Sequence, residues 1–135
     1  MEITKTIASV KELVPYAITS ILKEINLKES LSEDDEYDFR LLLEEALVNA
    51  IQHGNDFNTH LKVKTKIMLE NGLLTITVTD EGKGFDYNAL PDALEGNENI
   101  KKSGRGIILM KKIADEVRFD KSGSEITIIK KLKNQ

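Results

Sequence analysis

Residues 41–55 read Leu-Leu-Leu-Glu-Glu-Ala-Leu-Val-Asn-Ala-Ile-Gln-His-Gly-Asn, and their pattern predicts an amphipathic helix. Glu45 and Asn49 are four residues apart, so their side chains lie one above the other at the border of the apolar face. An acid and an amide beside a core can hold a divalent cation or relay a proton, although a solvated surface pair is the commoner outcome for such a stretch alone. The apolar face has the i, i+3, i+4, i+7 spacing and comprises Phe39, Leu42, Leu43, Ala46, Leu47, Ala50 and Ile51.

The composition indicates a globular protein. The 135 residues predict one domain, residues 1–135, with 40% hydrophobic and 31% charged residues. No cysteine is present, which excludes a disulfide framework and a thiolate metal site. The apolar runs are shorter than the roughly 20 residues that span a bilayer, and the N-terminus lacks a signal pattern, so we expect a cytoplasmic protein without a membrane segment.

The charge argues against direct binding of nucleic acid. The formal net charge is −4, whereas a nucleic-acid binder requires a basic face. Aromatic residues make up 5% of the chain and tryptophan is absent, so platforms for stacking bases are not expected.

The N-terminal third predicts a short edge strand and two helix starts. Residues 2–7 alternate weakly, and Ser9 followed by Glu12 has the spacing of a capping box. A helix over residues 14–25 accommodates Pro15 in its first turn.

The central helix has its own start and stop signals. Ser32, with Asp35 in an acidic first turn, predicts its N-cap. It is expected to run to about His53 and to stop at Gly54, where a positive φ is commonly required.

Two strands joined by a tight turn follow. Residues 61–69 and 74–78 alternate between apolar and polar side chains, and Asn71-Gly72 between them favours a type I′ hairpin. The period of two directs Asp80 to the core side, where a carboxylate requires a hydrogen-bond donor, such as one from a ligand.

Glycines concentrate in the next segment, which we expect to be largely irregular up to residue 102. A segment of this length without evident structure is usually a lid, a binding loop or a disordered linker, and a helix that opens directly on Gly106 follows it. A strand over residues 117–119, a turn over 121–124 and a last strand over 126–128 complete the chain. The glycines of this span are Gly82, Gly84, Gly96, Gly104 and Gly106.

Gly104-Arg105-Gly106 before a helix is a candidate anion site, because free N–H groups and the positive end of the helix dipole favour phosphate. Alone this is weak, since glycine before a helix is common. The G-x-x-x-x-G-K-[ST] and G-x-G-x-x-G motifs are absent, which disfavours a P-loop enzyme and a dinucleotide-binding domain.

Together these elements resemble the N, G1 and G2 boxes of the GHKL ATPases over nearly the whole chain. The boxes are Glu45-x-x-x-Asn49, Asp80-x-Gly82-x-Gly84 and Gly104-x-Gly106. Residues 44–54, 103–110 and 115–119 are most similar to the anti-sigma-factor serine kinases, the RsbW-like family. The resemblance implies a Bergerat-type α/β (α+β) two-layer sandwich, with a mixed, mainly antiparallel sheet and helices on one face.

The resemblance also implies roles for individual residues. Glu45 would be the general base and Asn49 the Mg²⁺ ligand, while Asp80 would accept the adenine amino group. Gly82 and Gly84 would let the backbone pass close to the adenine. Residues 88–102 would form a mobile lid. His53 is a candidate nucleotide-binding residue near that lid rather than a phosphoacceptor. The segment expected to wrap the phosphates is Ser103, Gly104, Arg105 and Gly106.

The function implied is binding of a sigma factor combined with Mg²⁺- and ATP-dependent phosphorylation of a Ser or Thr on a STAS-type anti-anti-sigma protein; the family also suggests a homodimer. Three alternatives remain open at this point. One is a protein-binding switch without kinase activity, with or without nucleotide. Another is the catalytic domain of a histidine kinase, disfavoured because no helix pair with a phosphoacceptor histidine precedes the boxes. The last is a purely structural protein.

Overall fold

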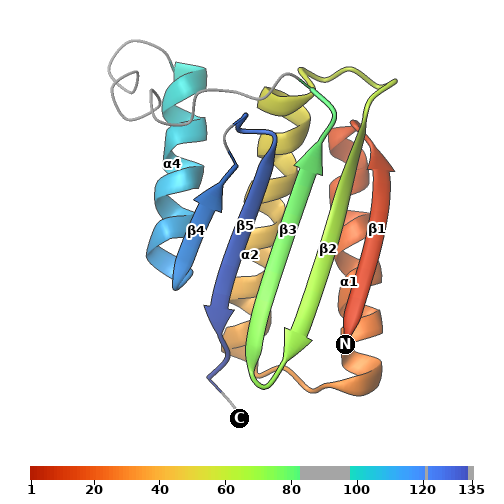
Figure 1. Cartoon of the computed structure of the whole chain (residues 1–135), viewed down its shortest axis with the longest axis vertical. Coiled ribbons are helices and arrows are strands. Elements are labelled where there is room, and N and C mark those ends of the chain that lie inside the picture. Colours follow the sequence, from red (N-terminus) through yellow and green to blue (C-terminus); the bar gives the residue numbers. More distant parts are fainter. Residues whose placement is uncertain (83–97, 121, 134–135) are drawn as a thin grey trace.

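The chain forms one antiparallel sheet with helices packed on one face (Figure 1). The computed structural model describes residues 1–82, 98–120 and 122–133; for residues 98–105 it describes the backbone only. The sheet has five strands in the order β1-β2-β3-β5-β4, and every described strand pair is antiparallel. The predicted two-layer sandwich is therefore confirmed, while the described strands form an antiparallel sheet rather than the mixed one that was expected. The strands are β1 (Glu2–Ala8), β2 (Lys62–Glu70), β3 (Leu73–Asp80), β4 (Glu116–Phe119) and β5 (Glu125–Lys131).

The helices α1 (Val14–Lys28), α2 (Glu33–Asn49) and α4 (Glu98–Ile113) lie behind the sheet in Figure 1. Burial alternates along β2 and β3, so every second side chain of these strands faces the helices. These inward side chains and the apolar faces of the helices form one core. The largest fully buried side chains are Phe39, Ile21, Ile25, Leu42, Leu43, Leu47, Ile51, Ile67, Leu74, Ile76, Met110 and Ile128.

The start of α1 agrees with the prediction in one respect and differs in another. Pro15 lies in the first turn, as predicted. The predicted capping box from Ser9 to Glu12 is wrong, since the N-cap of α1 is Leu13 and no side chain caps it. Ser9 is instead 1% exposed and donates its hydroxyl to the Leu61 carbonyl oxygen at 2.9 Å. The Ser9 hydroxyl is therefore bonded to a residue that is distant in sequence and does not cap the helix that follows.

The central helix begins as predicted and ends differently. Ser32 is the N-cap and its Oγ accepts a hydrogen bond from the Asp35 backbone N–H at 3.0 Å. After Asn49 the chain continues as a π-helical turn, η2 (Ala50–Gly54). The positive φ expected at Gly54 is wrong, because this glycine keeps a helical conformation and is required for another reason, given below.

The β2–β3 connection confirms the type I′ hairpin. Asn71 and Gly72 have φ values of 51° and 75°, and both central residues of such a turn require a positive φ. Glu70 pairs with Leu73 across the turn, which fixes the register of the hairpin and turns Asp80 toward the helices, with 7% of its surface exposed.

The predictions that the chain is irregular up to residue 102 and that a helix opens at Gly106 are wrong, since α4 already begins at Glu98. Gly104 and Gly106 thus lie inside a helix, where each glycine costs about 1 kcal/mol relative to alanine. A Cβ on Gly106 would overlap Glu45 Oε2, the end of a flexible side chain on α2, so a larger residue there would require the Glu45 carboxylate to move. Gly106 therefore lies in the contact between α2 and α4 rather than at the start of a helix.

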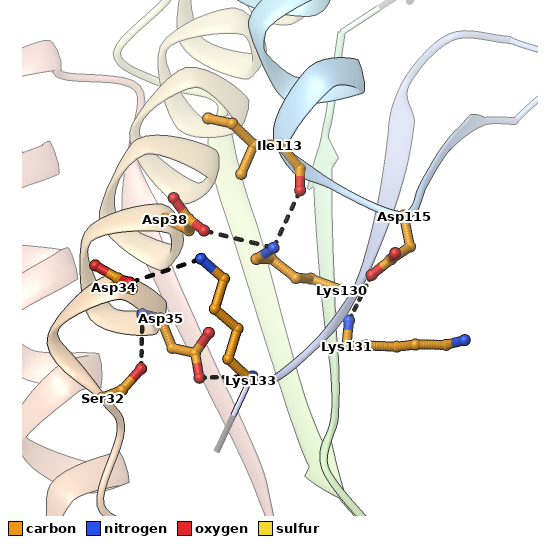
Figure 2. A network of polar contacts seen from close by, with 9 residues as sticks. All are labelled: Ser32, Asp34, Asp35, Asp38, Ile113, Asp115, Lys130, Lys131 and Lys133. Carbon is orange, nitrogen blue, oxygen red and sulfur yellow. Dashed lines mark hydrogen bonds and ion pairs between the residues drawn. The ribbon is translucent and has the colours of Figure 1, made fainter. Parts of the chain in front are cut away.

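A polar network connects α2, α4 and β5 at the end of the sandwich where α2 begins (Figure 2). Lys130 of β5 is 8% exposed, and its Nζ donates to the Ile113 carbonyl oxygen at 3.1 Å and lies 3.4 Å from Asp38 Oδ2. The backbone N–H of Lys133 donates to Asp35 Oδ2 at 3.0 Å. These contacts fix the last turn of α4 and the end of the final strand against α2.

Candidate nucleotide site

The motif residues that the structure describes gather at one end of the sandwich. Figure 1 shows the C-terminal end of α2, the end of β3, the β4–β5 turn and the start of α4 at the top of the view. The antiparallel order explains this, since β3 ends where β5 begins, and Asp80 N donates to the Ser124 carbonyl oxygen at 2.9 Å. Elements remote in sequence thus bring the predicted boxes together.

Asp80 is held between two glycines. Its Oδ1 accepts a hydrogen bond from Gly82 N at 2.9 Å. A Cβ on Gly54 would overlap the Asp80 carboxylate, and a Cβ on Gly82 would overlap the Gly54 carbonyl oxygen. Only residues without a side chain allow this approach. Gly82 was predicted to allow a close approach of the backbone, and the approach that the structure describes is to Gly54.

Glu45 and Asn49 occupy adjacent turns of α2, as their spacing predicted. Asn49 is 6% exposed, and its Nδ2 has no hydrogen-bond partner among the residues that the structure describes. An unsatisfied buried amide costs roughly 1–3 kcal/mol, so the site suits a ligand that brings an acceptor oxygen. Glu45 is half-buried against Gly106 of α4.

The electrostatics of the site favour uncharged forms in the absence of a partner. Burial raises the pKa of Glu45, and the neighbouring charge of Glu44 raises it further. Burial likewise raises the pKa of Asp80, opposed by the hydrogen bond from Gly82 N and reinforced by Asp120. Burial lowers the pKa of His53, which lies half-buried in η2. Perturbed groups of this kind concentrate at functional sites.

A small cavity of about 10 Å³ lies between α2 and the sheet at this end. This volume admits about one water molecule, so a nucleobase requires the lining side chains to move apart. A larger depression of about 560 Å³ lies at the opposite end, around the β2–β3 turn, but no predicted site residue lines it. The small cavity is lined by Ala46, Asn49, Ala50, Val78, Asp80, Phe119, Gly123, Ser124 and Ile126.

Some predicted residues are placed only in part. Gly84 lies outside the described residues, as do residues 88–97 of the predicted lid. Ser103, Gly104 and Arg105 belong to α4, so the free N–H groups of the first helical turn are those of residues 98–101. The phosphate role of Ser103 to Gly106 therefore stays a prediction.

Sequence patterns missed the tertiary contacts of Asn55, Ser9 and Gly54 and the positions of Phe119 and Ser124 at the cavity. Asn55 and Ser9 are buried and hydrogen-bonded to each other, with 2.6 Å between Asn55 Nδ2 and Ser9 Oγ. Gly54 was interpreted as a helix stop, and nothing local in the sequence indicates its contact with Asp80. Phe119 and Ser124 were interpreted only as strand and turn residues, although they line the cavity.

The sheet order, the paired Glu and Asn on α2 and the aspartate between glycines define an ATP-binding domain of the histidine-kinase type. The pattern of the histidine kinase-like ATPase domain matches residues 8–130, and the chain belongs to this family. Family membership makes it a nucleotide-binding protein.

The chain is also similar to individual proteins of known function. It is 30% identical to the serine-protein kinase RsbW of Staphylococcus epidermidis, over 77% of this chain and 70% of that protein. It is 29% identical to the anti-sigma F factor of Bacillus subtilis, over 75% of this chain and 70% of that protein. The predicted resemblance to the anti-sigma-factor kinases is thereby confirmed. Among the described residues, no helix combines the length and apolarity needed to cross a membrane.

Proposed function

We propose that the protein is an anti-sigma-factor kinase. It binds ATP with Mg²⁺, phosphorylates a Ser or Thr of a STAS-type anti-anti-sigma protein, and binds a sigma factor that is released by partner exchange. The observation that carries the proposal is the half-buried Glu45 one helical turn from the buried Asn49, at the same end as Asp80. Within the described part of the chain, Nδ2 of Asn49 has no hydrogen-bond partner. The similarity to a serine-protein kinase and to an anti-sigma factor supports this combination of activities.

The nucleotide is oriented by both layers of the sandwich. The Asp80 carboxylate, turned toward the core at the end of β3, accepts the adenine amino group, while Gly82 and Gly84 admit the base close to the backbone. His53 and the residues from Ser103 to Gly106 contact the remainder of the nucleotide. The unsatisfied Nδ2 of Asn49 suits a phosphate oxygen brought by the ligand.

The residues present fit a Mg²⁺ ion held mainly by the nucleotide. Among the described residues, no group of three or more His, Cys, Asp and Glu side chains could hold a metal. Mg²⁺ prefers few protein ligands together with phosphate oxygens and water, and the amide oxygen of Asn49 supplies one. When bound, the ion supplies neutralisation of phosphate charge.

The chain contributes a base to the transfer. The hydroxyl oxygen of the substrate serine forms a bond to the γ-phosphorus, the bond from that phosphorus to the β–γ bridging oxygen breaks, and ADP departs. The hydroxyl proton passes to the Glu45 carboxylate. The raised pKa of Glu45 makes this carboxylate a stronger base than an exposed glutamate.

Two measurements test the proposal. Calorimetric titration of ADP and ATP with Mg²⁺ should show binding by the wild type and a collapse of binding in Asp80→Asn. Incubation with labelled ATP and purified STAS-domain proteins from the same genome should transfer label to a Ser or Thr. Transfer should be lost in Glu45→Ala and retained in the matched control Glu44→Ala.

Each alternative has its own outcome. Nucleotide binding without transfer to any STAS protein would indicate a binding switch. Label on this chain itself, without a substrate protein, would indicate an autokinase. Absence of nucleotide binding by the wild type would refute the proposal.

Two further parts of the proposal concern assembly and location. The family resemblance suggests a homodimer, and light scattering of the purified protein tests it. We place the reaction in the cytoplasm, where sigma factors bind RNA polymerase, and fractionation tests that placement.

A further inference from the structure

We infer that Asn55 is a positioning residue for purine recognition. It fixes the peptide bond between Asp80 and Glu81, and so determines how well the site distinguishes a 6-amino purine from a 6-oxo purine. The inference rests on the proposed nucleotide site, because Asn55 acts through Asp80. None of the roles assigned to residues above involves Asn55.

The side chain of Asn55 joins the ends of three strands. It is 2% exposed, and its Nδ2 donates to Ser9 Oγ at 2.6 Å and to the Lys62 carbonyl oxygen at 3.0 Å. Its Oδ1 accepts a hydrogen bond from the Glu81 backbone N–H at 2.9 Å. Both N–H groups and the carbonyl oxygen of the amide are therefore used, by the residue after β1, the first residue of β2 and the residue after β3.

The π-helical turn delivers Asn55 to this position. Asn55 N donates to the Ala50 carbonyl oxygen at 2.8 Å, and Phe57 N donates to the Ile51 carbonyl oxygen at 2.8 Å. A π turn places one more residue in the helical loop than an α turn, and such turns are frequent at functional sites. The same turn brings Gly54 against both Asp80 and Gly82.

The contacts of Asn55 bear directly on the orientation of Asp80. Glu81 N belongs to the peptide unit that begins at the Asp80 carbonyl carbon, so the Asn55–Glu81 hydrogen bond holds the backbone on one side of Asp80. On the other side, Asp80 N is held by the Ser124 carbonyl oxygen at 2.9 Å. With both peptide units fixed, the carboxylate can discriminate a donor from an acceptor at position 6 of the purine. If the Asn55–Glu81 hydrogen bond is lost, Asp80 stays buried but the direction of its carboxylate is less well defined.

The network also provides a matched control. Ser9 is buried like Asn55 and hydrogen-bonded to it, but the Ser9 hydroxyl does not contact Glu81. Ser9→Ala removes a buried hydrogen bond of the same network and leaves the Asn55–Glu81 bond in place. Asn55→Ala removes all three bonds of the amide, and Asn55→Asp removes the two donors while keeping the acceptor.

The experiment compares dissociation constants for ADP and inosine diphosphate, which carries a 6-oxo group, by calorimetry with Mg²⁺. The wild type and Ser9→Ala should prefer ADP by the same ratio. Asn55→Ala should lower this preference roughly tenfold or more, the effect of one misaligned hydrogen bond to a charged group, and Asn55→Asp should lower it less. Asp80→Asn should weaken ADP binding to the level of inosine diphosphate or below, consistent with the collapse expected above, so that no preference for ADP remains.

The outcomes separate this inference from the proposed function. A wild-type ratio in Asn55→Ala, together with a lost preference in Asp80→Asn, would overturn the role of Asn55 and leave the nucleotide site intact. An unchanged preference in Asp80→Asn would refute the adenine role of Asp80 itself. Hydrogen exchange of the wild type adds a test that does not depend on whether a variant folds. The Glu81 amide should be as protected as the amides within β3, and rapid exchange would overturn the inference.

Discussion

Gly54→Ala should disrupt the nucleotide site because of one steric overlap. The new Cβ would overlap the Oδ2 and Cγ of Asp80 and would lie 2.9 Å from its Cβ. Ordinary carbon contacts are about 3.5–4.0 Å, so the carboxylate has to move by about 1 Å or more. Because Gly54 has no positive φ, alanine fits the backbone and would by itself stabilise the turn by up to about 1 kcal/mol. Any loss therefore reports on the contact with Asp80.

The size of the effect follows from two terms. Overpacking of a buried site costs about 1–3 kcal/mol, which exceeds the helical gain in most of that range. A displaced Asp80 forfeits a hydrogen bond to the base worth about 1.5–3 kcal/mol, so the dissociation constant for ADP should rise about tenfold or more. Urea denaturation and calorimetric titration measure the two effects, with Gln52→Ala in the same turn as the control.

A double-mutant cycle with Asp80→Ala tests the cause. This background removes two of the three overlapping atoms, so the destabilisation by Gly54→Ala should shrink by about 1–2 kcal/mol. If the free energies of unfolding instead add within about 0.5 kcal/mol, the two residues are not coupled and the steric argument is wrong.

Three further predictions concern charge. Glu44→Gln should move the acid limb of the pH profile of phosphoryl transfer to lower pH, because the Glu44 charge raises the pKa of the Glu45 base; an unmoved limb contradicts this. Asp80→Asn should raise the free energy of unfolding at pH 7, since a carboxyl whose folded pKa is raised above 3.8 contributes stability below that value and loses it as pH rises through the folded pKa. The gain should disappear in urea titrations below about pH 3.8, and an equal gain at every pH would refute it. Lys130→Met should lose about 2 kcal/mol in the same assay at pH 7, because it leaves a half-buried carboxylate without its ion-pair partner, and a loss below about 0.5 kcal/mol would show that the pair is unimportant.

Local patterns were sufficient for most of the fold. The alternation of apolar and polar residues predicted β2 and β3. Asn71-Gly72 predicted the turn between them, because a type I′ turn requires a positive φ at two adjacent residues. The same register predicted that Asp80 faces the core. The spacing of Glu45 and Asn49 is equally local, and the structure confirms that both lie on α2, one helical turn apart.

The failures share a physical cause, which is that a distant partner determined the outcome. Ser9 has the sequence of a capping residue, but its hydroxyl is bonded to Leu61 across the sheet. Gly54 lies against Asp80 and Gly106 lies against the end of the Glu45 side chain, and neither contact is encoded within a few residues. The start of α4 was missed for a similar reason: glycine lowers helix propensity by an amount that packing against α2 can offset.

Each end of the sandwich has one buried side-chain atom without a hydrogen-bond partner among the described residues, Asp35 Oδ1 at one end and Asn49 Nδ2 at the other, and the acids with raised pKa values, Glu45 and Asp80, lie at the second end. At one end the buried Lys130 ammonium has a carbonyl oxygen and a carboxylate within 3.4 Å, so the network there is a structural anchor. At the other end Asn49 has an unsatisfied amide, and Glu45 and Asp80 have pKa values raised by burial. These groups are unfavourable in the protein alone and become favourable only with a ligand that supplies both acceptors and donors, as a purine nucleotide does. Nucleotide should therefore stabilise this end of the molecule more than the other, and hydrogen exchange should show the added protection near Asp80 rather than near Lys130.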